Sequence, residues 1–85
     1  MEDKELLITL GKKITSSGLR KTTKFKSLIT KLTYTDISEI CEELILLCLQ
    51  YDINCQFLIN ALSEYKHSEI SEDELRKRVL TALTR

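Results

Sequence analysis

The chain contains no proline and no tryptophan, and only two of its 85 residues are glycine. Proline and glycine interrupt helices, so their scarcity beside 42% hydrophobic and 31% charged residues is typical of an all-α domain. The formal net charge is zero, and with apolar residues this abundant we do not expect an intrinsically disordered chain. The length fits a single helical domain over residues 1–85.

Long apolar runs are also missing. The longest run has six residues, at positions 44–49, whereas a transmembrane helix needs about 20. The first residues are acidic and no cleavage site of small residues follows, so we expect neither a secretory signal nor a membrane partner. Three cysteines are an odd number, which argues against a disulfide framework and favours a reducing cytoplasm.

Residues 35–52 are the most apolar stretch and predict the central helix of a bundle. Ile45 and Leu49 widen its apolar face until only a narrow polar strip remains. A helix of this kind is normally buried against several neighbours. Its apolar face recurs at helical spacing and consists of Ile37, Ile40, Cys41, Leu44, Leu47, Cys48 and Tyr51.

Four further segments have the period of an amphipathic helix: residues 3–17, residues 23–32, a segment from Ile53 or Asn54 to Lys66, and a last segment that follows Ser71. We therefore predict an all-α, single compact bundle of five to six antiparallel helices, the sixth being a short turn around residues 32–35. Three basic residues of the last helix, Arg76, Lys77 and Arg78, are expected to face outward. The expected inward faces are Leu7, Leu10 and Ile14, then Phe25, Leu28, Ile29 and Leu32, then Phe57, Leu58, Ala61, Leu62 and Tyr65, and finally Leu75, Val79, Ala82 and Leu83.

Polar residues and glycine mark the helix ends. Gly18 suits the left-handed position after the first helix, and Leu19 would fold back on Ile14 in a Schellman motif. Residues that accept hydrogen bonds from a first helical turn precede three other helices: Thr22 or Thr23, Asp36 with Glu39 in a capping box, and Ser71 with Glu74 in another.

No set of side chains predicts catalysis, a cofactor or a metal. Cys41, Cys48 and Cys55 are seven residues apart, whereas zinc ligands are usually two to four apart and number four, so we expect small buried side chains instead. The single histidine, His67, has no predicted catalytic partner, and the isolated glycines form no phosphate loop. We therefore expect a protein that is not an enzyme.

Charged residues are sorted along the chain. Residues 12–31 contain seven bases and no acid, and residues 36–64 contain six acids and no base. At helical spacing Leu46 shares a face with three glutamates, as an apolar anchor within a charged strip would. The simpler alternatives are two solvated faces and a single exposed leucine without a role. The candidate partner-binding residues are Arg20, Lys24 and Lys31 on a basic face, and Glu39, Glu42, Glu43 and Leu46 on an acidic one.

The charge pattern favours a protein partner, either a copy of this domain in a weak homo-oligomer or a related helical domain. Nucleic acid is not the expected partner, because the basic segment has one aromatic residue, Phe25, on its apolar stripe. The alternative function is a small helical nucleic-acid-binding regulator that uses the basic segment 12–31.

Residues 35–65 carry a resemblance to a known family. A helix opens with the residues TDIS at 35–38, continues through ELI at 43–45, and leads through a polar corner to FLINAL at 57–62. This order resembles the bacterial effector-associated domains of the death-like superfamily. The resemblance implies a six-helix bundle and a non-enzymatic adaptor that assembles with like domains in prokaryotic defence or signalling.

Overall fold

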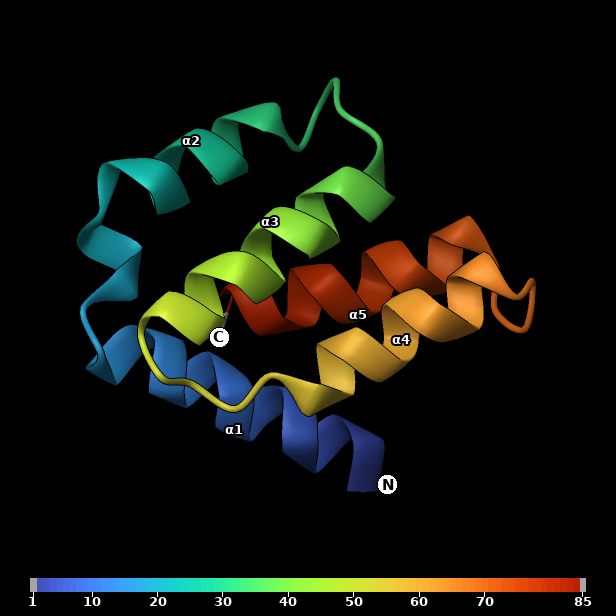
Figure 1. Cartoon of the computed structure of the whole chain (residues 1–85), viewed down its shortest axis with the longest axis horizontal. Coiled ribbons are helices and arrows are strands. Elements are labelled where there is room, and N and C mark those ends of the chain that lie inside the picture. The colour runs from blue at the N-terminus through green and yellow to red at the C-terminus, as the bar shows by residue number, and fades with distance from the viewer. Residues whose placement is uncertain (1, 85) are drawn as a thin grey trace.

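The computed structural model describes residues 2–84, with side chains from residue 5 to residue 83. Within that range all regular structure is helical and no strand occurs, which confirms the predicted all-α bundle (Figure 1). The elements are α1 (Glu2–Ser16), a 3₁₀ helix η1 (Leu19–Lys21), α2 (Thr23–Lys31), α3 (Ile37–Gln50), α4 (Gln56–Lys66) and α5 (Glu72–Thr84).

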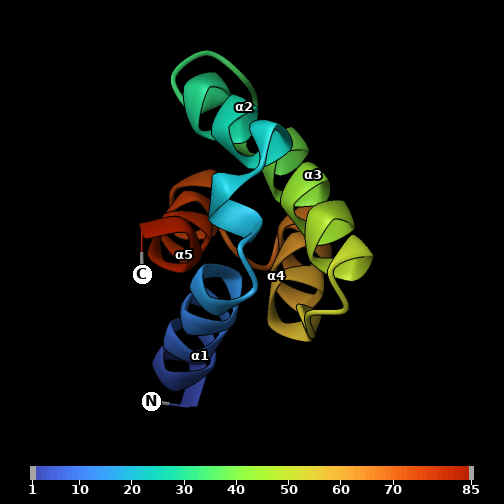
Figure 2. The same cartoon turned by 90° about the vertical axis from the view of Figure 1, so that its left-hand side faces the viewer.

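Two helices share the centre of the bundle. The predicted central helix, α3, contacts α2, α4 and α5, while α5 contacts α1, α3 and α4. Figure 2 shows α1 and α2 at opposite ends of this arrangement, joined through η1. The inward face predicted for α5 is confirmed, because Leu75, Val79, Ala82 and Leu83 are all buried.

Three apolar residues expected on buried faces are exposed: Ile29, Leu49 and Tyr51. Ile29 lies at the edge of the apolar stripe of α2. This helix packs mainly on α3 and η1, so its edge is left uncovered. Leu49 lies on the outer half of α3, and Tyr51 follows the last residue of that helix. These three expectations were wrong because helical spacing does not state how wide an arc the neighbours cover.

The sixth element lies between α1 and α2 and not around residues 32–35, as we had expected. Gly18 has φ 84°, which only glycine adopts freely, and it turns the chain so that Leu19 enters the core. The Leu19 amide donates to the Ser17 hydroxyl over 3.2 Å, in place of the expected Schellman bond. Residues 32–34 form hydrogen-bonded turns that continue the end of α2.

The predicted N-terminal caps are present. The Thr22 hydroxyl accepts from the Phe25 amide, and the Ser71 hydroxyl accepts from the Glu74 amide, each over 3.1 Å. The Asp36 carboxylate caps α3 by accepting from the Ser38 amide over 3.1 Å, one residue earlier than a capping box requires.

Schellman turns end both α3 and α4. After α3, the Ile53 amide donates to the Cys48 carbonyl over 2.8 Å, with Asp52 at φ 57°. After α4, the Glu69 amide donates to the Glu64 carbonyl over 2.8 Å, with Ser68 at φ 61°. The first turn uses Ile53, so α4 begins at Gln56 and later than predicted.

Replacing Ser68 with glycine tests the second turn. A left-handed backbone costs a non-glycine residue roughly 1–2 kcal/mol, part of which glycine loses again through its larger unfolded-state entropy. We expect Ser68→Gly to raise the free energy of unfolding by about 0.5–1 kcal/mol and Tm by about 2–8 °C, measured by thermal unfolding.

The matched control is Ser63→Gly, at an exposed position inside α4. Glycine is a poorer helix former than serine, so this variant should lose about 0.5 kcal/mol. A fall in Tm for both variants would contradict the account of the turn.

Candidate protein-binding surface

The outer strip of α3 carries the most exposed apolar side chains of the helix. Leu46 is 61% exposed and Leu49 is 57% exposed. They are three residues apart and therefore neighbours on the helix surface. Leu46 borders two hollows, one toward α2 and one toward α4, so it forms a ridge between them.

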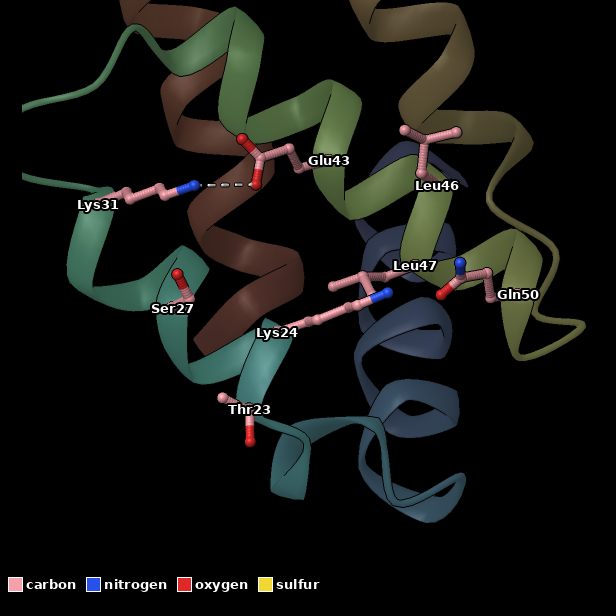
Figure 3. A pocket seen from close by; sticks show the side chains of 8 residues that line it. All are labelled: Thr23, Lys24, Ser27, Lys31, Glu43, Leu46, Leu47 and Gln50. Carbon is pink, nitrogen blue, oxygen red and sulfur yellow. Dashed lines mark hydrogen bonds and ion pairs between the residues drawn. The ribbon is translucent and has the colours of Figure 1, made fainter.

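The first hollow, the α2–α3 groove, has a volume of about 490 Å³. In Figure 3 the Lys24 side chain extends from α2 toward Leu47 and Gln50, while Lys31 points at Glu43. Both basic and acidic candidate residues therefore meet in one groove. It is lined by Thr23, Lys24, Ser27 and Lys31 from α2, and by Glu43, Leu46, Leu47 and Gln50 from α3.

The second hollow, the α3–α4 groove, has a volume of about 530 Å³ and is more apolar. Four aliphatic side chains line it, and charged or polar groups lie around them. Helical spacing did not predict this groove, because nothing in the sequence indicates that α4 packs beside Leu46. Its lining consists of Glu42, Ile45, Leu46, Ile59, Leu62, Ser63, Lys66 and His67.

Two ion pairs flank the ridge, and both involve predicted site residues. Lys31 Nζ lies 3.5 Å from Glu43 Oε1, and Lys66 Nζ lies 3.1 Å from Glu42 Oε2. These groups are partly solvated, so each pair contributes at most about 1 kcal/mol. The basic and acidic faces predicted from the sequence are thus neighbours that partly neutralise each other.

Arg20 does not belong to this surface. It lies in η1, where Nε donates to the Thr15 hydroxyl over 2.8 Å and Nη1 donates to the Leu83 carbonyl. Its guanidinium carbon also lies 5.5 Å from the centre of the Phe25 ring. Arg20 does not share the expected basic face with Lys24, because the extended backbone at Thr22 separates η1 from α2.

Arg78 is a second basic residue with a structural role, although it was expected to face outward. It lies between Glu64, at 3.2 Å, and Glu74, at 3.1 Å. Its guanidinium carbon is 5.6 Å from the centre of the Phe57 ring. Arg78 therefore joins α4 to α5, and only the packing of these two helices places it there.

The three cysteines are free and buried, as small core side chains are. Burial raises the pKa of the Cys41 and Cys48 thiols to about 12, and it also raises the pKa of Cys55. Cys41 Sγ lies 3.8 Å from the Leu58 carbonyl oxygen, which ties α3 to α4. No group of three or more metal-ligating side chains occurs among the residues described.

His67 directly follows the last residue of α4, and its ring is exposed. Nδ1 is 2.8 Å from the Ser63 carbonyl oxygen, so this nitrogen donates and carries the proton. The ring borders the α3–α4 groove near Lys66. The ring is therefore a polar group at the border of a mainly aliphatic groove.

No protein-family model matches the chain, and comparisons with curated proteins and with solved structures likewise return no match. The resemblance to effector-associated domains therefore stays a prediction. Within the described part of the chain, no helix is long and apolar enough to cross a membrane.

A pair of leucine substitutions checks which face of α3 is exposed. Leu44 is fully buried, so Leu44→Ala should lower the free energy of unfolding by about 2–5 kcal/mol. Leu46→Ala should change it by less than about 0.5 kcal/mol, because the side chain already contacts water. Urea unfolding measures both, and equal losses would contradict the exposure of Leu46.

The buried thiols predict an alkaline loss of stability. A thiol with an unfolded pKa near 9.0 ionises in the unfolded chain above that pH, while Cys41 and Cys48 stay neutral in the fold up to about 12. The free energy of unfolding should therefore be unaffected by these groups below pH 9 and fall between pH 9 and 12, by up to about 1.4 kcal/mol per pH unit for each thiol.

The control is the double variant Cys41→Ala, Cys48→Ala. Alanine has no ionisable proton, so the free energy of unfolding of the double variant should fall less steeply over the same pH range. Urea unfolding at a series of pH values measures both slopes, and identical slopes would refute this assignment.

Proposed function

We propose that this chain is a non-enzymatic protein-interaction domain that pairs with another helical domain, a copy of itself or a related one, through the outer strip of α3. The single observation that supports this most is Leu46, 61% exposed between two grooves. An exposed apolar residue surrounded by charged groups is how binding hot spots are often built.

The apolar part of the strip would provide most of the binding free energy. Fully burying a leucine side chain contributes about 1.5–3 kcal/mol, and Leu46 and Leu49 each have more than half of their surface left to bury. The aliphatic lining of the α3–α4 groove extends the same surface.

The charged rim would act on orientation more than on affinity. The Lys31–Glu43 and Lys66–Glu42 pairs stand on either side of the ridge and are already formed within one copy. Charge complementarity at a rim steers and aligns partners, while each screened pair contributes little. Pairing should therefore be weak unless a fused or bound oligomer raises the local concentration.

The biological role that fits such a surface is that of an adaptor. The resemblance of residues 35–65 to effector-associated domains supports assembly with like domains in prokaryotic signalling or defence. The three free cysteines accord with a place in the reducing cytoplasm.

Nucleic acid is the less supported partner for the basic segment. Phe25 is only 3% exposed and is unable to stack on bases. Arg20 is bound to the protein itself, and Lys31 pairs with Glu43. Two of the seven basic residues of segment 12–31 are thus engaged within the protein.

Sedimentation velocity between about 10 µM and 1 mM tests the proposal. We expect self-association with a Kd of roughly 0.1–1 mM, equivalent to about 4–5.5 kcal/mol. Leu46→Ala should weaken it about tenfold, since a loss of 1.4 kcal/mol corresponds to that factor.

Leu6→Ala is the matched control, because Leu6 is 51% exposed but lies on α1. It removes the same atoms from another face and should leave the Kd unchanged. A monomer up to 1 mM, or equal effects of the two variants, would refute self-association through the outer strip of α3.

A further inference from the structure

Opposite charges lie next to each other on the proposed surface. Along the sequence, bases and acids fall in separate segments, which predicts two separate faces suited to head-to-tail contacts. The structure instead places Lys31 3.5 Å from Glu43 across the α2–α3 groove (Figure 3). One face therefore carries both halves of a complementary pattern.

The pattern has a direction along α3. Lys24 approaches the C-terminal half of α3 beside Gln50, whereas Glu43 lies nearer the N-terminal half. Glu39 lies one turn before Glu43 on the same side of the helix. Glu39 and Gln50 are eleven residues apart, or about 16 Å along the axis. Lys24 therefore stands alone at one end of the groove, whereas Glu43 at the other end is paired with Lys31 and the exposed Glu39 lies one turn beyond it.

We infer that the partner is a second copy of this chain, which docks through the α2–α3 groove about a two-fold axis that crosses the groove near Leu46. The inference rests on the proposed function and names its partner. The rotation sets the Lys24 end of each copy against the Glu39–Glu43 end of the other, and it brings the two Leu46 side chains together. Such a contact uses the same patch twice and closes as a dimer.

The charges favour this arrangement over other occupants. The formal net charge is zero, so two copies do not repel each other at long range. Lys24 and Glu39 have no ion pair within the described part of the chain. They form pairs across the interface without breaking the Lys31–Glu43 contact. A head-to-tail contact between two copies would form one Lys24–Glu39 pair, whereas the two-fold contact forms two.

The floor of the groove also fits this arrangement. Thr23 and Ser27 are short side chains on the α2 side, opposite Leu46 and Leu47. They leave a hollow of about 490 Å³, which gives room to an aliphatic side chain of the second copy. A cluster of the two Leu46 side chains with Leu47 would provide the dry centre of the contact, with charged ends around it.

A charge-reversal series tests the inference. Lys24→Glu alone and Glu39→Lys alone should each weaken dimerisation at least tenfold, since each places two pairs of like charges in the contact. A one-to-one mixture of the two variants should form a heterodimer with near wild-type affinity. The double variant Lys24→Glu, Glu39→Lys should dimerise again on its own. Lys26→Glu, an exposed position on another side of α2, is the control and should have no effect.

Covalent capture tests the axis itself. With oxidised glutathione as the oxidant, the Leu46→Cys variant should form a disulfide-linked dimer at least tenfold faster than the Leu6→Cys variant. The native thiols are buried and serve as an internal control in the wild-type chain.

The outcomes separate this inference from the proposed function. A dimer as the largest species, restored by the mixed and double variants and captured through position 46, is the expected result. Assembly beyond a dimer, or a dimer that responds to Leu46→Ala and ignores the charge reversals, would overturn the two-fold contact and leave the proposed function standing. A monomer up to 1 mM would overturn the second copy as the partner and leave a related domain as the only partner in the proposed function.

Discussion

The packing of three helices around α3 is the constraint on which the rest of the structure depends. α2, α4 and α5 cover α3 so completely that six of its residues are buried and a single strip stays in water. The two grooves exist because α2 and α4 approach that strip from either side. A partner that bound along this strip would therefore contact α2, α3 and α4 at once.

Helical periodicity was enough to predict the fold class, the buried face of α5 and the exposure of Leu46. These features depend on the order of residues within one helix, where spacing places side chains directly. The positions of Arg20 and Arg78 were not predictable in this way. Each contacts residues from two or three elements, and their placement follows from how those elements pack.

The relation between the two charged segments was the part of the site most altered by the structure. Lys31 and Glu43 are twelve residues apart and belong to different helices. A chain that sorts its charges by segment appears to have separate faces, but the turn between α2 and α3 folds one segment onto the other. The separation along the sequence thus becomes adjacency in space, which is the basis of the proposed two-fold contact.

The two left-handed turns fix the position of one border of the proposed binding surface. Asp52 and Ser68 hold a costly backbone at the two ends of α4, and buried Ile53 anchors the first of these turns in the core. The position of α4 beside α3 is therefore set before any partner arrives. In the proposed complex, a surface ordered in advance would lose little conformational entropy on binding, so more of the free energy from burying Leu46 and Leu49 would remain as affinity.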